Sequence, residues 1–204
     1  MELKSHCRER FEPAVDAIRQ LLEEKKGSDE PLLAAIDGRC GSGKTTLGEY
    51  LKQIFDCNLF RIDDFFLRME QRTPERLREV GGNVDYERFE ETVLRPLLQK
   101  EQVCYQSFSC QEWGLLKAYP IPYKRLNIIE GSYSMHPYFK NPYHVRIFMN
   151  ISPEDQIANI KKRNGLEKAR QFQNIWIPKE EAYFEKFHVM EGAIQIMWNL
   201  KTEE

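Results

Sequence analysis

The chain has 204 residues, and 30 Lys and Arg against 32 Asp and Glu give it a formal net charge of −2. At roughly 150 residues per domain, this length predicts a single domain over residues 1–204 with room for a lid. Hydrophobic residues make up 41% of the chain, as in ordinary globular proteins. No apolar run approaches the ~18 residues that a membrane span needs, and the balanced charge gives no overall attraction to nucleic acid. We therefore expect neither a membrane nor a nucleic acid as a partner.

Five cysteines are scattered along the chain, and none lies in the spacing of a zinc site. This usage is typical of reduced thiols, because disulfides persist mainly in oxidising compartments. The N-terminal residues alternate charged with apolar side chains and form no continuous signal-peptide core. The sequence therefore predicts a cytoplasmic location, and it leaves a homo-oligomer open.

Apolar periodicity and turn residues predict alternating helices and strands. In the first half of the chain, the predicted elements are a helix over 9–25 within an N-terminal segment 1–31, a strand over 32–36, a helix over 44–56, a strand over 58–62 and a helix over 86–100. A strand over 102–108 and an irregular stretch over 118–123 follow, and then strands over 126–130 and 144–149. The last predicted elements are two helices, beginning near Pro153 and Pro178 within a segment 152–187 that includes the lid, and a strand over 193–198. Such alternation is typical of a mainly parallel sheet covered by helices on both faces, so the expected fold class is α/β. Within the loop 67–84, the segment 68–78 alternates basic with acidic residues and is long for an ordinary connection, which suggests a mobile substrate loop.

A glycine-rich segment follows the first long strand. Its residues Gly38-Arg39-Cys40-Gly41-Ser42-Gly43-Lys44-Thr45 match the phosphate-binding pattern G-x-x-x-x-G-K-[ST]. The glycines allow a turn that aims successive backbone N–H groups at phosphate oxygens, and the following helix adds the positive end of its dipole. Lys44 would contact the β- and γ-phosphates, and the Thr45 hydroxyl would bind magnesium. We therefore predict ATP and Mg²⁺ as ligands, with a nucleotide site formed by Gly38, Arg39, Cys40, Gly41, Ser42, Gly43, Lys44, Thr45 and Thr46.

Two predicted strands deliver carboxylates to the carboxyl edge of the sheet, where ligands bind in open α/β folds. Asp63 and Asp64 follow the strand over 58–62. A carboxylate that faces the γ-phosphate can accept the proton of a substrate hydroxyl. Glu130 ends the strand over 126–130, where P-loop proteins place an acid that holds magnesium. The sequence thus predicts a kinase site, and the absence of an Asn-Lys-x-Asp motif argues against a GTPase.

These residues resemble the phosphoribulokinase/uridine kinase family of P-loop kinases, from about Leu32 to Phe187. Besides the P-loop, the resemblance is carried by Asp63-Asp64-Phe65-Phe66, by Asn83-Val84-Asp85-Tyr86 with Phe89, and by Ile128-Ile129-Glu130-Gly131. It implies a three-layer P-loop NTPase fold with a helical lid. It also implies an ATP- and Mg-dependent, uridine kinase-like enzyme that transfers the γ-phosphoryl to a hydroxyl of a nucleoside-like small molecule, such as a riboside.

The same resemblance implies roles for single residues. Asp63 would be the catalytic base, Thr45 and Glu130 would hold the metal, and Asp85 would bind ribose hydroxyls. The segment Lys161-Lys162-Arg163-Asn164 is similar to the start of the family's lid. Lys44 and Arg163 would be catalytic cations. The remaining substrate-binding residues would be Phe66, Phe108 and Arg170.

One segment departs from the family pattern. Uridine kinases bind the pyrimidine through a Tyr and a His in the segment that corresponds to 106–113, and this chain has Gln where both would align. Other acceptors therefore remain open: nicotinamide riboside, pantothenate or a sugar phosphate. A regulatory P-loop ATPase is the alternative from another class. The tryptophans, Trp113, Trp176 and Trp198, are predicted to lie in the core or the pocket wall.

Overall fold

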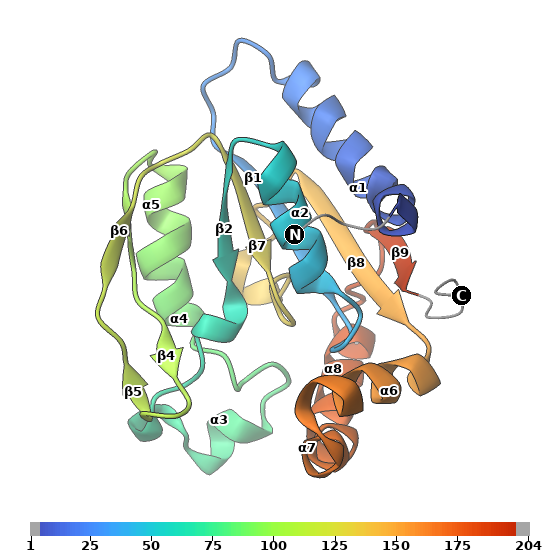
Figure 1. Ribbon diagram of the computed structural model, residues 1–204. Coiled ribbons are helices and arrows are strands. Elements are labelled where there is room, and N and C mark those ends of the chain that lie inside the picture. Colours follow the sequence, from blue (N-terminus) through green and yellow to red (C-terminus); the bar gives the residue numbers. More distant parts are fainter. Residues whose placement is uncertain (1–4, 199–204) are drawn as a thin grey trace.

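The computed structural model describes residues 5–198, so residues 1–4 and 199–204 of the predicted domain lie outside the described part (Figure 1). Its centre is a five-stranded sheet in the order β2-β7-β1-β8-β9. Every neighbouring pair in this sheet is parallel. The strands are β1 (Leu32–Gly38), β2 (Cys57–Arg61), β7 (Leu126–Glu130), β8 (Val145–Ile151) and β9 (Ile194–Trp198). The predicted α/β fold with a mainly parallel sheet is confirmed.

Helices cover the sheet on both faces, which produces three layers. The helices are α1 (Ser5–Glu24), α2 (Lys44–Ile54), α3 (Pro74–Arg78), α4 (Tyr86–Phe89), α5 (Arg95–Leu98), α6 (Pro153–Asn164), α7 (Leu166–Gln171) and α8 (Ile177–Lys186). A π-helical turn, Glu90–Leu94, joins α4 to α5, and a second one, Phe172–Trp176, joins α7 to α8. The predicted helix over 86–100 is therefore present, with a widened turn in its middle.

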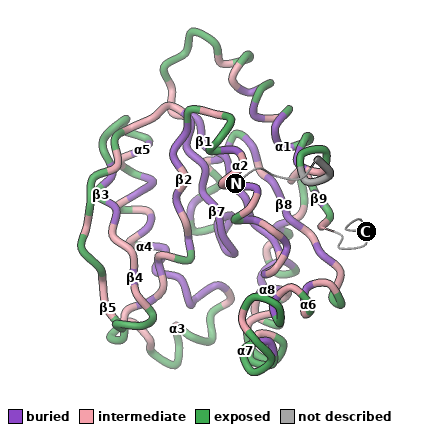
Figure 2. Tube along the Cα trace, in the orientation of Figure 1, coloured by how far each residue is buried: buried purple, intermediate pink, exposed green. Residues whose placement is uncertain are grey.

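Strand β1 shows why the layers form. All of its seven residues are buried, because neighbouring strands and helices enclose it on every side. Leu32, Ala34 and Ile36 pack with residues of α1 and α2, whereas Leu33 and Ala35 pack with residues of α4, α5 and α8 on the other face. Successive side chains of a strand point to opposite faces, so one apolar run contributes to both cores. Figure 2 shows buried strands in the centre, with much of α6 and α7 exposed.

The predicted strand over 102–108 is wrong as a strand of this sheet. The segment instead contributes β3 (Val103–Tyr105), which pairs antiparallel with β6 (Tyr119–Ile121), and β4 (Phe108–Ser109), which pairs antiparallel with β5 (Gly114–Leu115). In β3 the residues alternate buried, exposed, buried. This alternation is typical of a strand that has one face open, unlike the continuous apolar run Leu32–Ile36 of β1. The stretch over 118–123, expected to be irregular, contains β6.

The arginine-rich segment 67–84 is more structured than a bare connection. It contains a 3₁₀ turn, Met69–Gln71, and helix α3, whose first residue Pro74 follows the capping residue Thr73. Arg76 joins this segment to α4 through two hydrogen bonds of 2.7 Å to Glu87. None of the helices in the described residues is long and apolar enough to cross a membrane.

Candidate active site

The P-loop connects β1 to α2 in a turn that only glycine can make. Gly38 has φ 132°, and a Cβ there would lie 2.1 Å from the carbonyl oxygen of Met149 in β8. Gly43 has φ 86°, and a Cβ there would lie 2.7 Å from the ring of Trp198. Side chains are disfavoured at such φ values, and the neighbouring atoms leave no space for one. Lys44 begins α2, and its Nζ donates hydrogen bonds to the carbonyl oxygens of Gly38 at 2.7 Å and Arg39 at 3.0 Å. These bonds hold its ammonium group against the loop.

A cavity of about 740 Å³ opens beside the P-loop. It brings together predicted residues from four parts of the chain: Cys40, Gly41, Gly43, Lys44, Thr45, Thr46, Asp63, Phe66, Glu130 and Arg163. The other predicted residues do not line it: Gly38, Arg39, Ser42, Asp85, Phe108 and Arg170. Most of the nucleotide and metal predictions therefore meet in one place, whereas most of the acceptor predictions do not.

The two neighbouring acids after β2 have different environments. The hydroxyl of Tyr105 donates a 2.6 Å hydrogen bond to Asp64, and this bond holds Asp64 away from the cavity. Asp63 lines the cavity, and its carboxylate has no hydrogen-bond donor or ion-pair partner among residues 5–198. Its residue surface is exposed, and the surrounding protein raises its pKa by desolvation, with Glu180 and Asp64 adding to the shift and Lys44 opposing it. Asp63 is thus the acid that is free to meet a ligand.

Glu130 and Thr45 form an oxygen pair at the base of the cavity. The Thr45 hydroxyl donates a 3.1 Å hydrogen bond to Glu130, whose residue surface is 3% exposed. Burial raises the pKa of Glu130 to about 7, although Lys44 opposes the shift. A hydroxyl and a carboxylate are ligands that Mg²⁺ accepts, usually beside waters and phosphates. Ser42 in the same loop has a buried hydroxyl without a hydrogen-bond partner among the described residues. The donor set fits a magnesium–nucleotide complex.

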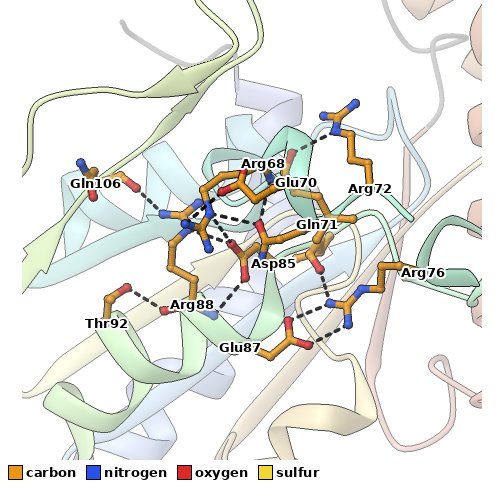
Figure 3. Close-up of polar contacts among 12 residues, drawn as sticks. Arg68, Glu70, Gln71, Arg72, Arg76, Asp85, Glu87, Arg88, Thr92 and Gln106 are labelled. Atoms are coloured by element: carbon orange, nitrogen blue, oxygen red, sulfur yellow. Dashed lines mark hydrogen bonds and ion pairs between the residues drawn. The ribbon is translucent and has the colours of Figure 1, made fainter. Parts of the chain in front are cut away.

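Asp85 is fixed in a network of arginines (Figure 3). It caps α4 by accepting a hydrogen bond from the backbone N–H of Arg88, and the Arg88 side chain approaches it to 3.2 Å. Arg68 lies 3.8 Å away on the other side. Asp85 is 1% exposed and does not line the cavity. The structure therefore places Asp85 as the cap of α4 and the charge partner of Arg88 and Arg68, outside the cavity.

Phe108 and Trp113 lie outside the cavity, in the hairpin formed by β4 and β5. Phe108 is 5% exposed, whereas Trp113 is 55% exposed. The prediction that Trp113 lies in the core or a pocket wall is therefore wrong. The guanidinium of Arg72 lies 4.9 Å from the Trp113 ring centroid and 6.0 Å from that of Phe108. The hairpin thus contacts the arginine-rich segment through a cation–π contact.

The two predicted lid arginines differ in whether they line the cavity. Arg163, at the end of α6, lines the cavity together with Lys162, and its charge lowers the pKa of Asp63. Arg170 in α7 is exposed and does not line the cavity. The sequence alone could not separate these residues, because the break between α6 and α7 at Gly165 was not predicted. Lys162 is an additional cation that the sequence did not single out.

Several cavity residues were missed. They are Asn83, Ser132, Asn159, Phe172 and Glu180. Trp176 and Trp198 also line the cavity, which confirms their predicted place in a pocket wall. Glu180 is the most unusual of these residues, because it is a carboxylate that is 5% exposed beside the P-loop. Its only signal in the sequence was an acidic pair in the first turn of a helix, a pattern that helix capping explains equally well.

The sequence matches no known protein family and no curated protein. Solved structures do match. A possible uridine kinase from Bacillus stearothermophilus is 20% identical with a TM-score of 0.64, over 94% of this chain and 99% of that one. A proposed fructose transport system kinase from Silicibacter sp. TM1040 is 18% identical with a TM-score of 0.66, over 93% of this chain and 98% of that one.

A D-glycerate 3-kinase from Cryptococcus neoformans is 16% identical with a TM-score of 0.60, over 84% of this chain and 87% of that one. At these identities the likeness concerns the fold. The protein therefore has the fold of the uridine kinase-like P-loop kinases and resembles them over most of its length.

Proposed function

We propose that this protein is a phosphotransferase that uses ATP and Mg²⁺ to phosphorylate a hydroxyl group of a small molecule. The observation that carries the proposal is the position of Asp63, a carboxylate without a donor that lines the same cavity as Lys44. An ATPase needs only to place a water molecule near the γ-phosphate. A cavity of about 740 Å³ beside the P-loop has room for a second substrate as well as a nucleotide.

Each residue has a defined task in this proposal. Asp63 accepts the proton of the acceptor hydroxyl, and desolvation by the surrounding protein supports this role by raising its pKa above that of an ordinary aspartate. Thr45 and Glu130 would hold Mg²⁺, which supplies charge neutralisation to the nucleotide phosphates when it is bound. Lys44 and Arg163 place positive charge around the phosphoryl group in transit, where negative charge spreads over three oxygens. Such transfer depends mainly on positioning and charge, which these residues provide.

We further propose that the acceptor is nucleoside-like and that the protein is cytoplasmic. The resemblance in fold to a possible uridine kinase supports the first proposal. The free thiols of Cys40, Cys57, Cys104 and Cys110 support the second. A sugar or sugar acid is the second acceptor class, since kinases named for fructose transport and D-glycerate share the fold.

The test is ADP release from MgATP with a panel of acceptors: uridine, cytidine, nicotinamide riboside, pantothenate, glycerate and sugar phosphates. Stimulation by one acceptor, with a matching phosphorylated product by mass spectrometry, is the expected result. Stimulation by a riboside supports the nucleoside-like assignment, and stimulation by a sugar or acid replaces it. ADP release that is independent of every acceptor would contradict the kinase and favour a P-loop ATPase.

A further inference from the structure

A carboxylate occupies one of the backbone donors of the P-loop. Glu180, in the first turn of α8, accepts a 2.9 Å hydrogen bond from the backbone N–H of Cys40. Its other oxygen accepts a 2.6 Å hydrogen bond from the hydroxyl of Ser132, in the loop that follows β7. Glu180 is 5% exposed and lines the same cavity as Lys44 and Asp63. Its negative charge therefore lies within the proposed phosphate site.

This contact conflicts with a bound nucleotide. The amide of Cys40 belongs to the loop whose N–H groups cradle phosphate oxygens. One N–H group makes one strong hydrogen bond, so it cannot fully serve both the Glu180 carboxylate and a phosphate oxygen. A phosphate that enters beside Glu180 also meets a buried like charge, and such repulsion is poorly screened away from water. Either the carboxylate moves or the phosphate binds less tightly.

Contacts other than that of Glu180 also attach α8 to the P-loop region. On the same helix, Glu181 forms two hydrogen bonds of 2.7 Å with Arg39, and the hydroxyl of Tyr183 donates a 2.8 Å hydrogen bond to Asp37. These contacts attach α8 to the end of β1 and the start of the loop. Glu180 differs from Glu181 and Tyr183 because its partner is a backbone N–H of the P-loop and because both it and Cys40 line the cavity.

The opposite side of the loop is held by α6. The side-chain amide of Gln156 donates a 3.0 Å hydrogen bond to the carbonyl oxygen of Cys40, and that of Asn159 donates one of 2.9 Å to the carbonyl oxygen of Gly41. The carbonyl oxygens of Cys40 and Gly41 thus have neutral donors as partners. The Cys40 N–H has an anionic acceptor, as it would with a bound phosphate.

We propose that Glu180 is a specificity-determining residue that competes with the γ-phosphate of ATP for the backbone N–H of Cys40. The inference rests on the proposed function, because it requires that nucleotide phosphates bind at this P-loop. Its consequence is that Glu180 opposes binding of a triphosphate more than binding of a diphosphate, since the γ-phosphate adds charge at the place where the acceptor meets the nucleotide. The carboxylate thus reduces the difference in affinity between ATP and ADP.

The experiment is calorimetric titration of the full chain with MgATP and with MgADP, for wild type, Glu180→Gln and Glu181→Gln. Glutamine has the same shape as glutamate and lacks the charge, so it can keep contact with Ser132. The ratio Kd(ADP)/Kd(ATP) should rise about tenfold in Glu180→Gln, the size expected when one charge-assisted competitor is removed. In Glu181→Gln, which alters the neighbouring contact to Arg39, the ratio should stay at the wild-type value.

A ratio that is unchanged or lower in Glu180→Gln would overturn the inference and make Glu180 a purely structural contact between α8 and the loop. If wild type binds neither nucleotide, the proposed function itself fails, so the two failures are distinguishable. Thermal unfolding of each variant checks the fold. Should Glu180→Gln not fold, Ser132→Ala is the second variant: it removes the donor that orients Glu180, and the ratio should again rise, whereas a constant ratio would count against the inference.

Discussion

At the scale of single residues, hydrogen-bond partners distinguish side chains that look equivalent in the sequence. Asp63 and Asp64 are consecutive acids after one strand, yet Tyr105 binds Asp64 and leaves Asp63 to the cavity. Tyr105 comes from β3, a strand whose place in the structure the sequence did not predict. Which of the two acids lines the cavity therefore depends on a contact from a distant segment. The family resemblance proposed Asp63 from its position in the motif alone.

Asp37 shows how burial links a carboxylate to pH. It is fully buried at the end of β1 and accepts hydrogen bonds from the backbone N–H groups of Gly38 and Met135 and from the hydroxyl of Tyr183. Desolvation raises its pKa from 3.8 to about 6, while these donors act in the opposite direction. Because the native state then binds more protons than the unfolded chain, this group's contribution to stability falls as the pH rises from about 4 to about 6.

We predict that Asp37→Asn lowers the free energy of unfolding by about 2 kcal/mol, because the asparagine NH₂ group leaves buried donors without an acceptor. The difference from wild type should be largest near pH 4 and should shrink towards pH 6, since the variant lacks the titrating group. Urea unfolding of both proteins across this range measures the difference. A difference that widens with rising pH would contradict the assignment.

At the scale of elements, the P-loop turn depends on a contact with the last strand. Gly41 and Gly43 both have positive φ values, +79° and +86°. A Cβ at Gly41 would lie 3.3 Å from the carbonyl oxygen of Gln156, whereas one at Gly43 would lie 2.7 Å from the Trp198 ring. Backbone strain is thus similar at the two positions, and the collision with a large ring is specific to Gly43.

We predict that Gly41→Ala destabilises the protein by about 1–2 kcal/mol through strain alone. Gly43→Ala should cost about 1–3 kcal/mol more, because the ring must be displaced. Thermal unfolding of the two variants compares them directly. Equal losses of stability would show that Trp198 does not constrain the turn.

The lid supplies a second comparison between elements. Arg163 in α6 lines the cavity, and Arg170 in α7 does not. We predict that Arg163→Ala lowers kcat about 10²-fold, as removal of a charge from a developing transition state does, while Arg170→Ala keeps a kcat close to that of wild type. Arg163→Lys should recover part of the loss, since it keeps the charge but not the planar fork. Steady-state kinetics with the best acceptor test this, and similar losses in both alanine variants would contradict the distinction.

At the scale of the whole molecule, apolar segments of the sequence predicted the strands of the central sheet. The strands over 32–36, 58–62, 126–130, 144–149 and 193–198 are all present. The signal is strongest for β1, which is buried along its whole length and apolar on both faces, whereas β9 at the edge of the sheet is only partly buried. The P-loop, Asp63 and Glu130 follow from the ends of these strands and therefore meet at one edge. Outside the sheet, prediction failed where tertiary contacts decide the outcome, as for the hairpins of 103–121.

The acceptor side of the site illustrates the same limit. Asp85 matched a family block, yet Arg68 and Arg88 surround it, and no local pattern predicts ion pairs across segments. Glu180 was missed because its partners, Cys40 and Ser132, are distant in the sequence. A sequence pattern predicts which residue types follow a strand, whereas the direction of each side chain is set by packing of the complete fold.

The measurement that tests the central claim most directly is the rate of acceptor-dependent phosphoryl transfer in Asp63→Asn, with Asp64→Asn as the matched control. Loss of a general base should lower kcat by about 10²- to 10⁴-fold in Asp63→Asn. Asp64→Asn should retain most of the activity, because Asp64 is held by Tyr105 and does not line the cavity. Near-normal transfer by Asp63→Asn, in a protein that remains folded, would contradict the proposed active site.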